Sequence, residues 1–439
     1  MLTVSLLRQA CRVLGWTALG PWPDLLRGVG SDTRQPLTDK VFVALVGEHF
    51  DGHDFIDAAV SAEASVLMVH RLVSSQVARR HPNCLVVGVE DTLYAMGELA
   101  RLAVLEDSRA VVAITGSAGK TTTRWALVQT LKALDVTVHT QVGNENNRIG
   151  VPRFVLNLPA PKDLDEVIVV ECGTSEPGEI ARLAAICRPN ISVVTSVCAA
   201  HTELLIDEAG VAHEKGDLLR AVAPSEGMAV FDLDDQRLAA AAVEGERRVL
   251  QPVPLHAAEG WSDAPAHLKA NGSKVLAVVR ALGHTLTPKI IEAARLNPPV
   301  GRGGLIQIGD WRVMDDSYNA NEASMTAALD AAALAAGDLP LVVCLGEMRE
   351  LGDHAEEAHI KVAQHAIAVG AKYLMFTGPY ASIAAAQAEG QGAIEVTVAV
   401  DASDLTKRID DLPRPAFILV KGSRGARMER LIDAMRERS

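Results

Sequence analysis

The sequence is poor in aromatic residues and contains no long apolar run. Only 4% of its 439 residues are Phe, Trp or Tyr, whereas apolar residues as a whole make up 49%. That apolar fraction excludes a disordered chain and is sufficient for the cores of two or three domains. No stretch approaches the length of a membrane-spanning helix, so no membrane span is expected. Met1–Trp16 lacks the basic stretch of a signal peptide and is expected to form a first helix of a cytoplasmic protein.

Paired cysteines and an excess of positive charge are also missing. The six cysteines are scattered without a CxxC spacing, which favours free thiols in a reducing compartment. The formal net charge of −13 argues against a protein that binds nucleic acid or anionic membranes nonspecifically. An anionic ligand therefore needs a local site rich in basic or amide groups. Because no interface-like apolar stripe stands out, we expect a monomer.

The most informative segment that is present is Ala113–Thr123, which reads AITGSAGKTTT. It overlaps a short apolar run, Ala110–Ile114, which is predicted to be a buried parallel strand. It precedes a predicted helix over Trp125–Leu134. A strand, a glycine loop with Lys-Thr and a helix form the context of a nucleotide-phosphate site. The two glycines are separated by two residues, whereas the common motif has four. This shorter spacing reduces the number of protein families that the loop fits.

Each part of the loop has a chemical use. Glycines allow backbone N–H groups to approach phosphate oxygens, and the next helix directs its positive end at the same anion. Lys120 supplies a point charge for the β- and γ-phosphates, and the Thr121 hydroxyl can bind Mg²⁺. The alternative, a strand-to-helix turn with a surface lysine, fits the whole pattern much less well. The predicted phosphate-binding residues are Gly116, Ser117, Ala118, Gly119, Lys120, Thr121 and Thr122.

The chain divides into three expected α/β units, residues 1–107, 108–297 and 298–439. In the first, short strands alternate with helical runs, as is typical of a small α/β domain. The second contains the glycine loop and further apolar strands that predict a parallel sheet. The third begins at a linker rich in Pro and Gly, and its repeated strands predict a doubly wound domain. Residues 235–274 follow no clear pattern, and the next helix is expected over Ser273–Leu282.

Chemistry is also expected at the strand ends, where open parallel sheets bind their ligands. Glu171 ends an apolar run, and either a metal or a paired arginine would offset the cost of burying its charge. The sequence leaves these two alternatives even. His201 follows another strand and Lys215 lies in a predicted helix. Each of these two residues, taken alone, is more often structural than functional.

Together these features resemble the Mur ligase superfamily, which comprises three-domain, ATP-dependent ligases that form amide bonds. The resemblance rests on the short glycine loop, Glu171, His201, Lys215 and Gly301-Arg302, and it covers nearly the whole chain. Further segments resemble the branch that adds D-alanyl-D-alanine to UDP-N-acetylmuramoyl-tripeptide. They are SDTR (31–34), FDGHDF (50–55), GNENNRIGVP (143–152), PGEI (177–180), DDSYNAN (315–321), GEMRELG (346–352) and VKGSRGARME (420–429).

The resemblance implies a small N-terminal α/β domain for the UDP-sugar substrate, a central P-loop ATPase-like domain with a parallel sheet, and a C-terminal Rossmann-like domain. It implies ATP and Mg²⁺ as cofactors and a reaction through an acyl phosphate. The implied substrates are UDP-N-acetylmuramoyl-tripeptide and D-alanyl-D-alanine, in the cytoplasmic synthesis of peptidoglycan precursors. A related ligase with another amino-acid or glycan-precursor substrate stays open, as does an ATP-binding regulatory protein without catalysis.

The resemblance also assigns roles to matching residues. Lys120, Lys215 and His201 would be catalytic, with Lys215 carried as a carbamate. Thr121 and Glu171 would bind one Mg²⁺ ion and His201 a second. Further nucleotide contacts would come from Asn271, Arg302, Asp316, Asn319 and Asn321. The substrates would contact Asp32, Thr33, Arg34, Asn146, Asn147, Lys421, Ser423 and Arg424. A packing or capping role for any of the last three fits the sequence nearly as well.

The chain departs from the family pattern mainly around the substrates. Leu268 stands where an asparagine usually follows the histidine of the adenine segment. Thr174 lies in a segment reading CGTS where the family usually has MGAN. Glu145 and Arg148 carry charges where an apolar and an acidic residue are usual, and their opposite signs can compensate each other. These departures concern the peptide and adenine contacts rather than the phosphate and metal positions.

Overall fold

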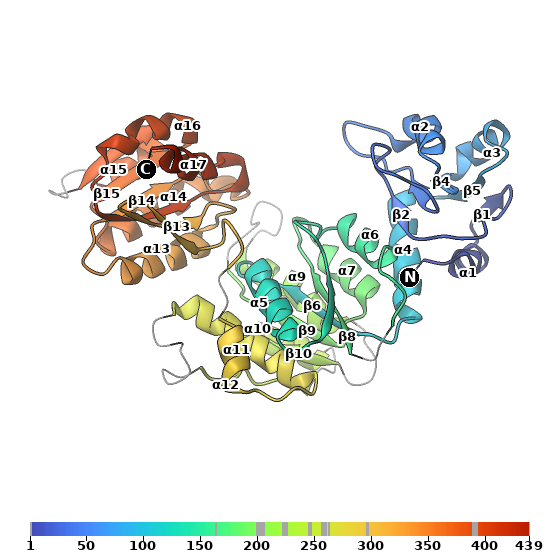
Figure 1. The fold of residues 1–439 in the computed structure, drawn as a ribbon, viewed down its shortest axis with the longest axis horizontal. Helices are drawn as coiled ribbons and strands as arrows, with labels where there is room; N and C mark the ends of the chain where they lie inside the picture. Colours follow the sequence, from blue (N-terminus) through green and yellow to red (C-terminus); the bar gives the residue numbers. More distant parts are fainter. Residues whose placement is uncertain are drawn as a thin grey trace.

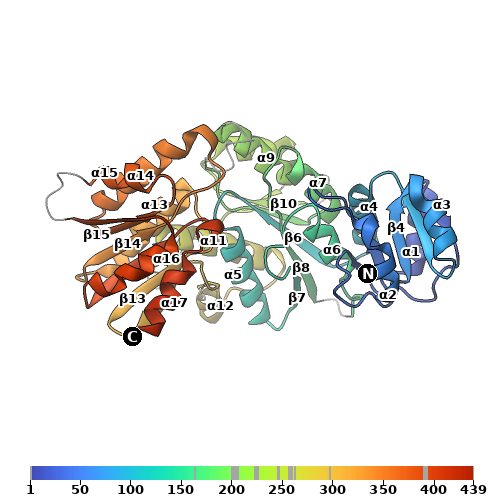
Figure 2. The same ribbon diagram turned by 90° about the horizontal axis from the view of Figure 1, so that it is seen from above.

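Three α/β units lie in a row, with the central unit between the other two (Figures 1 and 2). The computed structural model describes residues 2–162, 165–198, 207–221, 227–244, 248–255, 261, 264–295, 298–388 and 394–438. Each unit contains one sheet, and the α/β class predicted from the sequence is confirmed. None of the helices in these ranges is long and apolar enough to cross a membrane. The domain boundaries near residues 107 and 297 stay predictions.

The N-terminal unit is built around a five-stranded sheet. Its elements are α1 (Val4–Leu14), β1 (Thr17–Leu19), β2 (Val29–Gly30), β3 (Val41–Val43), η1 (Gly52–Phe55), α2 (Ile56–Ser61), β4 (Val66–His70), α3 (Arg71–Arg80), β5 (Leu85–Val89) and α4 (Thr92–Leu105). The strand order is β1-β5-β4-β3-β2, and only β1 is antiparallel to its neighbour. The predicted first helix begins at the cap Thr3, whose hydroxyl accepts a hydrogen bond from the Leu6 N–H.

The central unit contains a wholly parallel sheet in the order β11-β10-β9-β6-β8-β7. Its elements are β6 (Ala110–Thr115), α5 (Lys120–Lys132), β7 (Thr137–Thr140), α6 (Gly150–Leu156), β8 (Glu166–Glu171), α7 (Glu179–Cys187), β9 (Ile191–Val194), α9 (Glu208–Arg220), β10 (Met228–Val230), α10 (Gln236–Glu244), β11 (Arg248–Val249), α11 (Ala266–Ala281) and α12 (Pro288–Ala293). A parallel sheet needs apolar cover on both faces. Val112 packs toward α5 and α11, whereas Val111 packs toward α6 and α7.

Helix α4 joins the first two units through a shared hydrophobic core. Its Leu99 is fully buried in a cluster that contains Val87 of β5 and Val155 of α6. Arg182 of α7 adds an ion pair with Glu98 of α4, with an N–O distance of 2.7 Å. Because apolar burial is the dominant favourable term in folding, these contacts make the first two units one packed body.

The third unit is doubly wound, as predicted. Its elements are β12 (Gly304–Ile308), β13 (Trp311–Asp316), α13 (Glu322–Ala336), β14 (Leu341–Leu345), η3 (Gly352–His354), α14 (Ala355–Ala368), β15 (Tyr373–Thr377), α15 (Ala381–Ala386), β16 (Glu395–Ala399), α16 (Ala402–Leu405), η4 (Thr406–Asp411), β17 (Ala416–Lys421), η5 (Arg424–Ala426) and α17 (Glu429–Glu437). The strand order is β12-β13-β17-β14-β15-β16, and only β12 is antiparallel. Val343 packs toward α13 and α14, whereas Val342 packs toward α16 and α17.

The clearest difference from the sequence prediction is helix α11. It begins at Ala266, whereas a helix was predicted only from Ser273. The Asn271-Gly272-Ser273 run has low helix propensity, so the sequence did not indicate the first two turns of this helix. Tertiary packing explains why the helix forms: Trp261 lies against Gly272, where a Cβ would come within 2.3 Å of the indole ring.

The shared core predicts a strong effect of truncating Leu99. Leu99→Ala should lower the free energy of unfolding by about 2–5 kcal/mol, because it leaves a cavity between two units. Leu105→Ala on the same helix is the matched control, since that side chain is 48% exposed and should change stability little. Urea titrations followed by circular dichroism measure both. Equal, small shifts of the two midpoints would contradict the shared core.

Candidate active site

A cleft of about 770 Å³ lies between the central and third units. Helix α13 closes one side of it, and Asn321 Nδ2 reaches across to donate a 3.3 Å hydrogen bond to the Ser117 carbonyl oxygen. Most of the predicted site residues meet here, although they come from distant parts of the sequence. Those that line the cleft are Ser117, Ala118, Gly119, Lys120, Thr121, Thr122, Asn146, Asn147, Glu171, Asn271, Arg302, Asp316, Asn319, Asn321 and Lys421.

The glycine loop is held against the end of strand β9. Gly116 and Gly119 both have positive φ angles, 147° and 79°. A Cβ on Gly116 would lie 2.0 Å from Thr195 Oγ1, so only glycine fits this approach. The N–H of Ser117 donates to the Ser196 carbonyl oxygen at 2.9 Å. The loop is therefore a fixed backbone cradle of the kind that phosphate binding requires.

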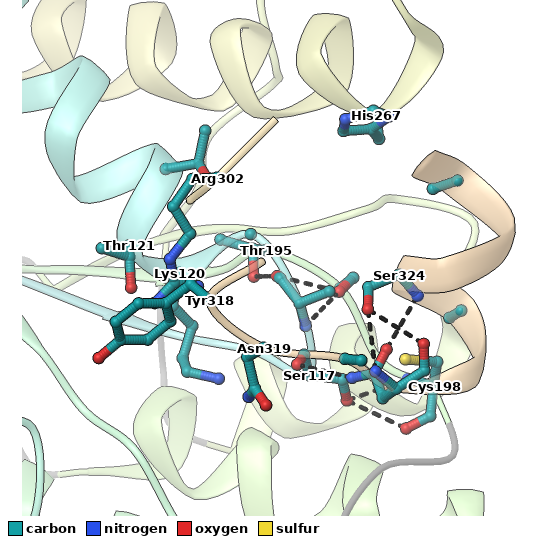
Figure 3. Close-up of a pocket in the computed structure, with 18 of the residues that line it drawn as sticks. Ser117, Lys120, Thr121, Thr195, Cys198, His267, Arg302, Tyr318, Asn319 and Ser324 are labelled. Carbon is teal, nitrogen blue, oxygen red and sulfur yellow. Dashed lines mark hydrogen bonds between the residues drawn. The ribbon is translucent and has the colours of Figure 1, made fainter. Parts of the chain in front are cut away.

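Helix α5 starts directly at Lys120, five residues before the predicted start. The run Lys-Thr-Thr-Thr has modest helix propensity, which explains the late prediction. The cap residue Gly119 provides no side-chain hydrogen bond, so the first N–H groups of the helix remain for an anion. The Lys120 ammonium donates to the Gly116 carbonyl oxygen at 2.6 Å, and burial lowers the pKa of Lys120. Figure 3 shows its side chain next to Arg302 and Tyr318.

Glu171 combines both alternatives that the sequence left open. Its Oε1 accepts hydrogen bonds from Thr121 Oγ1 at 3.1 Å and Asn146 Nδ2 at 2.9 Å. Its Oε2 lies 3.3 Å from Arg124 Nε, and only 3% of the residue is exposed. The paired arginine is therefore present, and the hydroxyl–carboxylate edge beside the phosphate cradle fits Mg²⁺ as well.

His201, predicted to bind a second metal, lies outside the described residues. Within the described ranges, no three His, Cys, Asp or Glu side chains gather into a metal-binding group.

Lys215 lies on α9 and is fully buried. Its ammonium nitrogen has no hydrogen-bond partner among the described residues. Burial, together with the nearby charge of Lys120, lowers the pKa of Lys215 to about 7. An unpartnered buried amine is costly unless it is neutral or chemically modified. This environment suits an amine that reacts as a neutral nucleophile.

The third unit contributes charge to the opposite wall of the cleft. The Arg302 guanidinium lies over the Tyr318 ring, 4.0 Å from its centroid, and burial lowers the pKa of Arg302. Asp316 forms an ion pair with the buried Lys421, whose Nζ lies 2.6 Å from Asp316 Oδ2. Lys421 also donates to the Asn319 carbonyl oxygen at 2.9 Å. Lys421 therefore supports the predicted nucleotide residues.

A second cavity of about 250 Å³ adjoins the cleft, and Lys120 lines it as well. Ser423, Arg424 and Arg349 line it, together with Asn319. Ser423 Oγ accepts a 3.0 Å hydrogen bond from the Arg349 N–H, and Arg424 pairs with Glu429 at 2.8 Å. Lys120 thus lines both cavities.

Asn271 lies against the glycine loop. A Cβ on Gly119 would come within 2.8 Å of Asn271 Nδ2. Leu268, one turn earlier on α11, lines the cleft and packs against the core beneath the helix. His267 also lines the cleft from this helix and faces α13 (Figure 3).

The predicted N-terminal substrate residues Asp32, Thr33 and Arg34 do not line the cleft. Asp32 and Arg34 form an ion pair at 2.9 Å. Hydrogen bonds from Arg34 lower the pKa of Asp32 to about 2, and the charge of Arg153 on α6 lowers it slightly. Arg153 therefore places this loop near the segment that contains Asn146 and Asn147.

Glu145 and Arg148, whose opposite charges can compensate each other, each pair with another residue in the structure. Glu145 pairs with Arg153, with an N–O distance of 2.6 Å. Arg148 instead pairs with Glu179 at 3.0 Å and with Glu176 at 3.3 Å. The physical reason is that the Glu145 side chain extends toward α6 and the Arg148 side chain toward α7, so the two pair with different residues.

Several residues at the site were not predicted individually. Ser196 anchors the loop, Tyr318 supports Arg302, and Arg349 lines the second cavity. The last two lie within the DDSYNAN and GEMRELG segments, which singled out the region but not the residue. Nothing in the sequence indicated a role for Asp232 or Lys274. Lys274 in particular resembles a surface lysine when only the sequence is considered.

Comparisons with known proteins agree with this architecture. The family description "Mur ligase middle domain" matches residues 114–278, and "Mur ligase, glutamate ligase domain" matches residues 301–424. The UDP-N-acetylmuramoyl-tripeptide–D-alanyl-D-alanine ligase of Escherichia coli K12 is 32% identical, over 94% of both chains.

The chain belongs to the Mur ligase family.

Solved structures of family members share its fold. MurF from Acinetobacter baumannii matches with a TM-score of 0.82 at 24% identity, over 99% of this chain and 98% of that one. MurF ligase from Thermotoga maritima, solved in complex with ADP, matches with a TM-score of 0.78 at 24% identity, over 94% and 98% of the two chains. The three-unit arrangement is therefore that of a Mur ligase.

The close approach of Gly116 to β9 predicts a specific sensitivity in this Mur ligase. Gly116→Ala should weaken binding of a fluorescent ATP analogue at least about tenfold, since the added methyl group displaces the loop from Thr195. Gly283→Ala is the control, because that glycine also has a positive φ but no atom lies within 4 Å of its Cβ position. Equal affinities of the two variants would refute the steric argument.

Proposed function

We propose that this Mur ligase adds D-alanyl-D-alanine to UDP-N-acetylmuramoyl-tripeptide, with cleavage of ATP to ADP and phosphate. The observation that carries the proposal is that Lys120 lines both a cleft that fits a nucleotide and a second cavity lined by Ser423, Arg424 and Arg349. The relative from Escherichia coli, similar over nearly its whole length, has a name that states this activity. The Thermotoga maritima relative binds ADP.

The first step is transfer of the γ-phosphoryl group of ATP to the tripeptide carboxylate. A carboxylate oxygen attacks phosphorus, the bond to the β-γ bridging oxygen breaks, and ADP leaves. Lys120, the α5 N-terminus and Arg302 stabilise the negative charge on the transferred group. Binding of phosphate next to Lys120 also offsets the burial that lowers its pKa.

Mg²⁺ fits the edge formed by Thr121 and Glu171, with Asn146 beside it. When bound there, the ion supplies positive charge that orients the phosphate oxygens. His201 would hold a second ion. Arg124 on the opposite oxygen of Glu171 keeps that carboxylate oriented.

The second step is attack of the dipeptide amine on the acyl carbon, with loss of inorganic phosphate. Arg349 and Arg424 in the second cavity suit the dipeptide carboxylate, since arginine binds carboxylates through paired donors. Because an acyl phosphate reacts with water, the two walls must exclude solvent while it exists. The Asn321–Ser117 contact holds the third unit against the loop during that interval.

Lys215 is proposed to act as a carbamate. Its neutral amine attacks CO₂ and releases one proton, which converts a buried nitrogen without a partner into an anionic carboxylate group. That group would help to place the second metal ion. The low pKa of Lys215 favours this reaction, since the neutral form is the nucleophile.

We further propose that the protein is a cytoplasmic monomer that binds neither nucleic acid nor membrane. The net charge of −13 supports this assignment. The domain roles follow the same proposal: residues 1–107 bind the UDP-sugar, residues 108–297 bind ATP, and residues 298–439 complete the ligase site.

The proposed role of Lys120 predicts that Lys120→Ala lowers turnover by about 10²-fold or more without unfolding the protein. Phosphate release in the presence of both substrates measures turnover, and circular dichroism checks the fold. Lys132→Ala, at the exposed end of the same helix, is the control and should retain activity. Near-normal phosphate release by Lys120→Ala would refute the phosphate role.

The amine donor is tested by comparing D-alanyl-D-alanine with diaminopimelate and L-lysine. Phosphate release only with D-alanyl-D-alanine supports the proposal, whereas release only with another amine favours a related ligase. Absence of any substrate-dependent ADP formation favours a regulatory protein. The charged pairs of Glu145 and Arg148 near the peptide make this comparison necessary.

The carbamate predicts a pH-dependent signal. With ¹³C-bicarbonate, a carbamate resonance should grow as the pH rises through about 7, because deprotonation of Lys215 creates the reactive amine. Lys215→Ala should lose both the resonance and the activity, and small carboxylic acids should partly restore activity. Lys215→Arg retains a positive charge but cannot form a carbamate, so it is the control for the effect of charge alone. Full activity of either variant would contradict the assignment.

A further inference from the structure

An ion pair that no step above uses lies at the wall of the nucleotide cleft. Lys274 of α11 is 1% exposed, and its Nζ lies 2.6 Å from Asp232 Oδ1. The same nitrogen donates to the Thr195 carbonyl oxygen at 3.0 Å. The Asp232 side chain is 55% exposed and lines the cleft. One carboxylate oxygen is thus held from behind by a buried cation, and the group faces the space where ATP is proposed to bind.

The strand order places Asp232 on one particular side of the glycine loop. The loop follows β6, and Glu171 ends β8 on one flank. Asp232 follows β10, beyond β9 on the opposite flank. Because Glu171 marks the metal and γ-phosphate side, Asp232 faces the nucleoside end of a bound nucleotide. Asn271, one helical turn before Lys274, lies on the same side against Gly119.

The charge of Asp232 restricts what it can bind. A carboxylate only accepts hydrogen bonds and is repelled by phosphate oxygens, so its partner must be a neutral donor. A nucleoside offers such donors in its ribose hydroxyls and in an exocyclic amine. Lys274 balances the negative charge and fixes one oxygen, which leaves the other to the ligand.

We propose that Asp232 is a nucleotide-specificity residue that accepts a hydrogen bond from a neutral donor of the nucleoside, and that Lys274 is its positioning residue. This inference rests on the proposed ATP-dependent function. It assigns to α11 and the end of β10 a selective contact that the phosphate cradle alone does not provide. Lys274 also connects this contact to the loop, since Thr195 Oγ1 donates to the Ala118 carbonyl oxygen.

The test measures nucleotide binding to the full chain by calorimetry, together with KM and kcat for ATP. Asp232→Asn should raise the dissociation constant and KM for ATP roughly tenfold and leave kcat nearly unchanged. Asp234→Asn is the matched control, because that carboxylate also follows β10 but does not line the cleft. Lys274→Met should weaken ATP binding more than Asp232→Asn, since it leaves a carboxylate without its counter-charge in a site for a polyanionic ligand. The double variant should return to the Asp232→Asn value.

Nucleotide analogues identify the donor. If it is a ribose hydroxyl, wild type should discriminate against 2′-deoxy-ATP or 3′-deoxy-ATP, and Asp232→Asn should lose that discrimination. If it is the exocyclic amine, inosine triphosphate should give the same pattern. Unchanged ATP affinity of Asp232→Asn, or an equal loss for every analogue, would overturn the inference. Wild type that fails to bind ATP at all would instead overturn the proposed function. Should Lys274→Met fail to fold, the comparison of Asp232→Asn with Asp234→Asn still decides.

Discussion

The contact between Gly116 and the end of strand β9 is the constraint on which the site depends. With no Cβ at this position, the loop backbone reaches Thr195 and Ser196, and helix α5 can begin at Lys120. That start places Lys120 in the lining of both cavities and Thr121 beside Glu171. Any side chain at residue 116 would push the loop away and separate these groups at once. A single steric requirement therefore positions the glycine loop, the Thr121–Glu171 pair and Lys120.

The distribution of charge follows from the same geometry. The chain has a net charge of −13, yet Lys120, Arg302 and Arg124 gather around the cradle. Burial lowers the pKa of both Lys120 and Arg302, which shows that these cations carry a desolvation cost. A polyanionic ligand offsets that cost only when it is bound between the two units. Attraction of the ligand is therefore local, and the rest of the negative surface does not contribute to it.

The sequence predicted those parts of the site that are encoded locally. The glycine loop, the strand-end Glu171 and the alternating strands of the third unit are each visible within a few residues. Arg124 as the partner of Glu171 could not be predicted, because the pair forms only when α5 packs beside β8. The opposite charges of Glu145 and Arg148 allowed mutual compensation, but the partners that they have, on α6 and α7, could not be read from the sequence. The role of Lys274 could not be predicted, because its burial and its two hydrogen-bond acceptors depend on strands far away in the sequence.

The hydrophobic core shared through α4 has a mechanical consequence. Separating the first two units would expose Leu99 and its apolar neighbours to water, whereas the described contacts between the central and third units include hydrogen bonds such as Asn321–Ser117. Separating the central and third units therefore costs far less free energy than separating the first two units. The first two units thus keep the Asp32–Arg34 loop and the glycine loop at a constant separation, and the third unit is the part that moves relative to both.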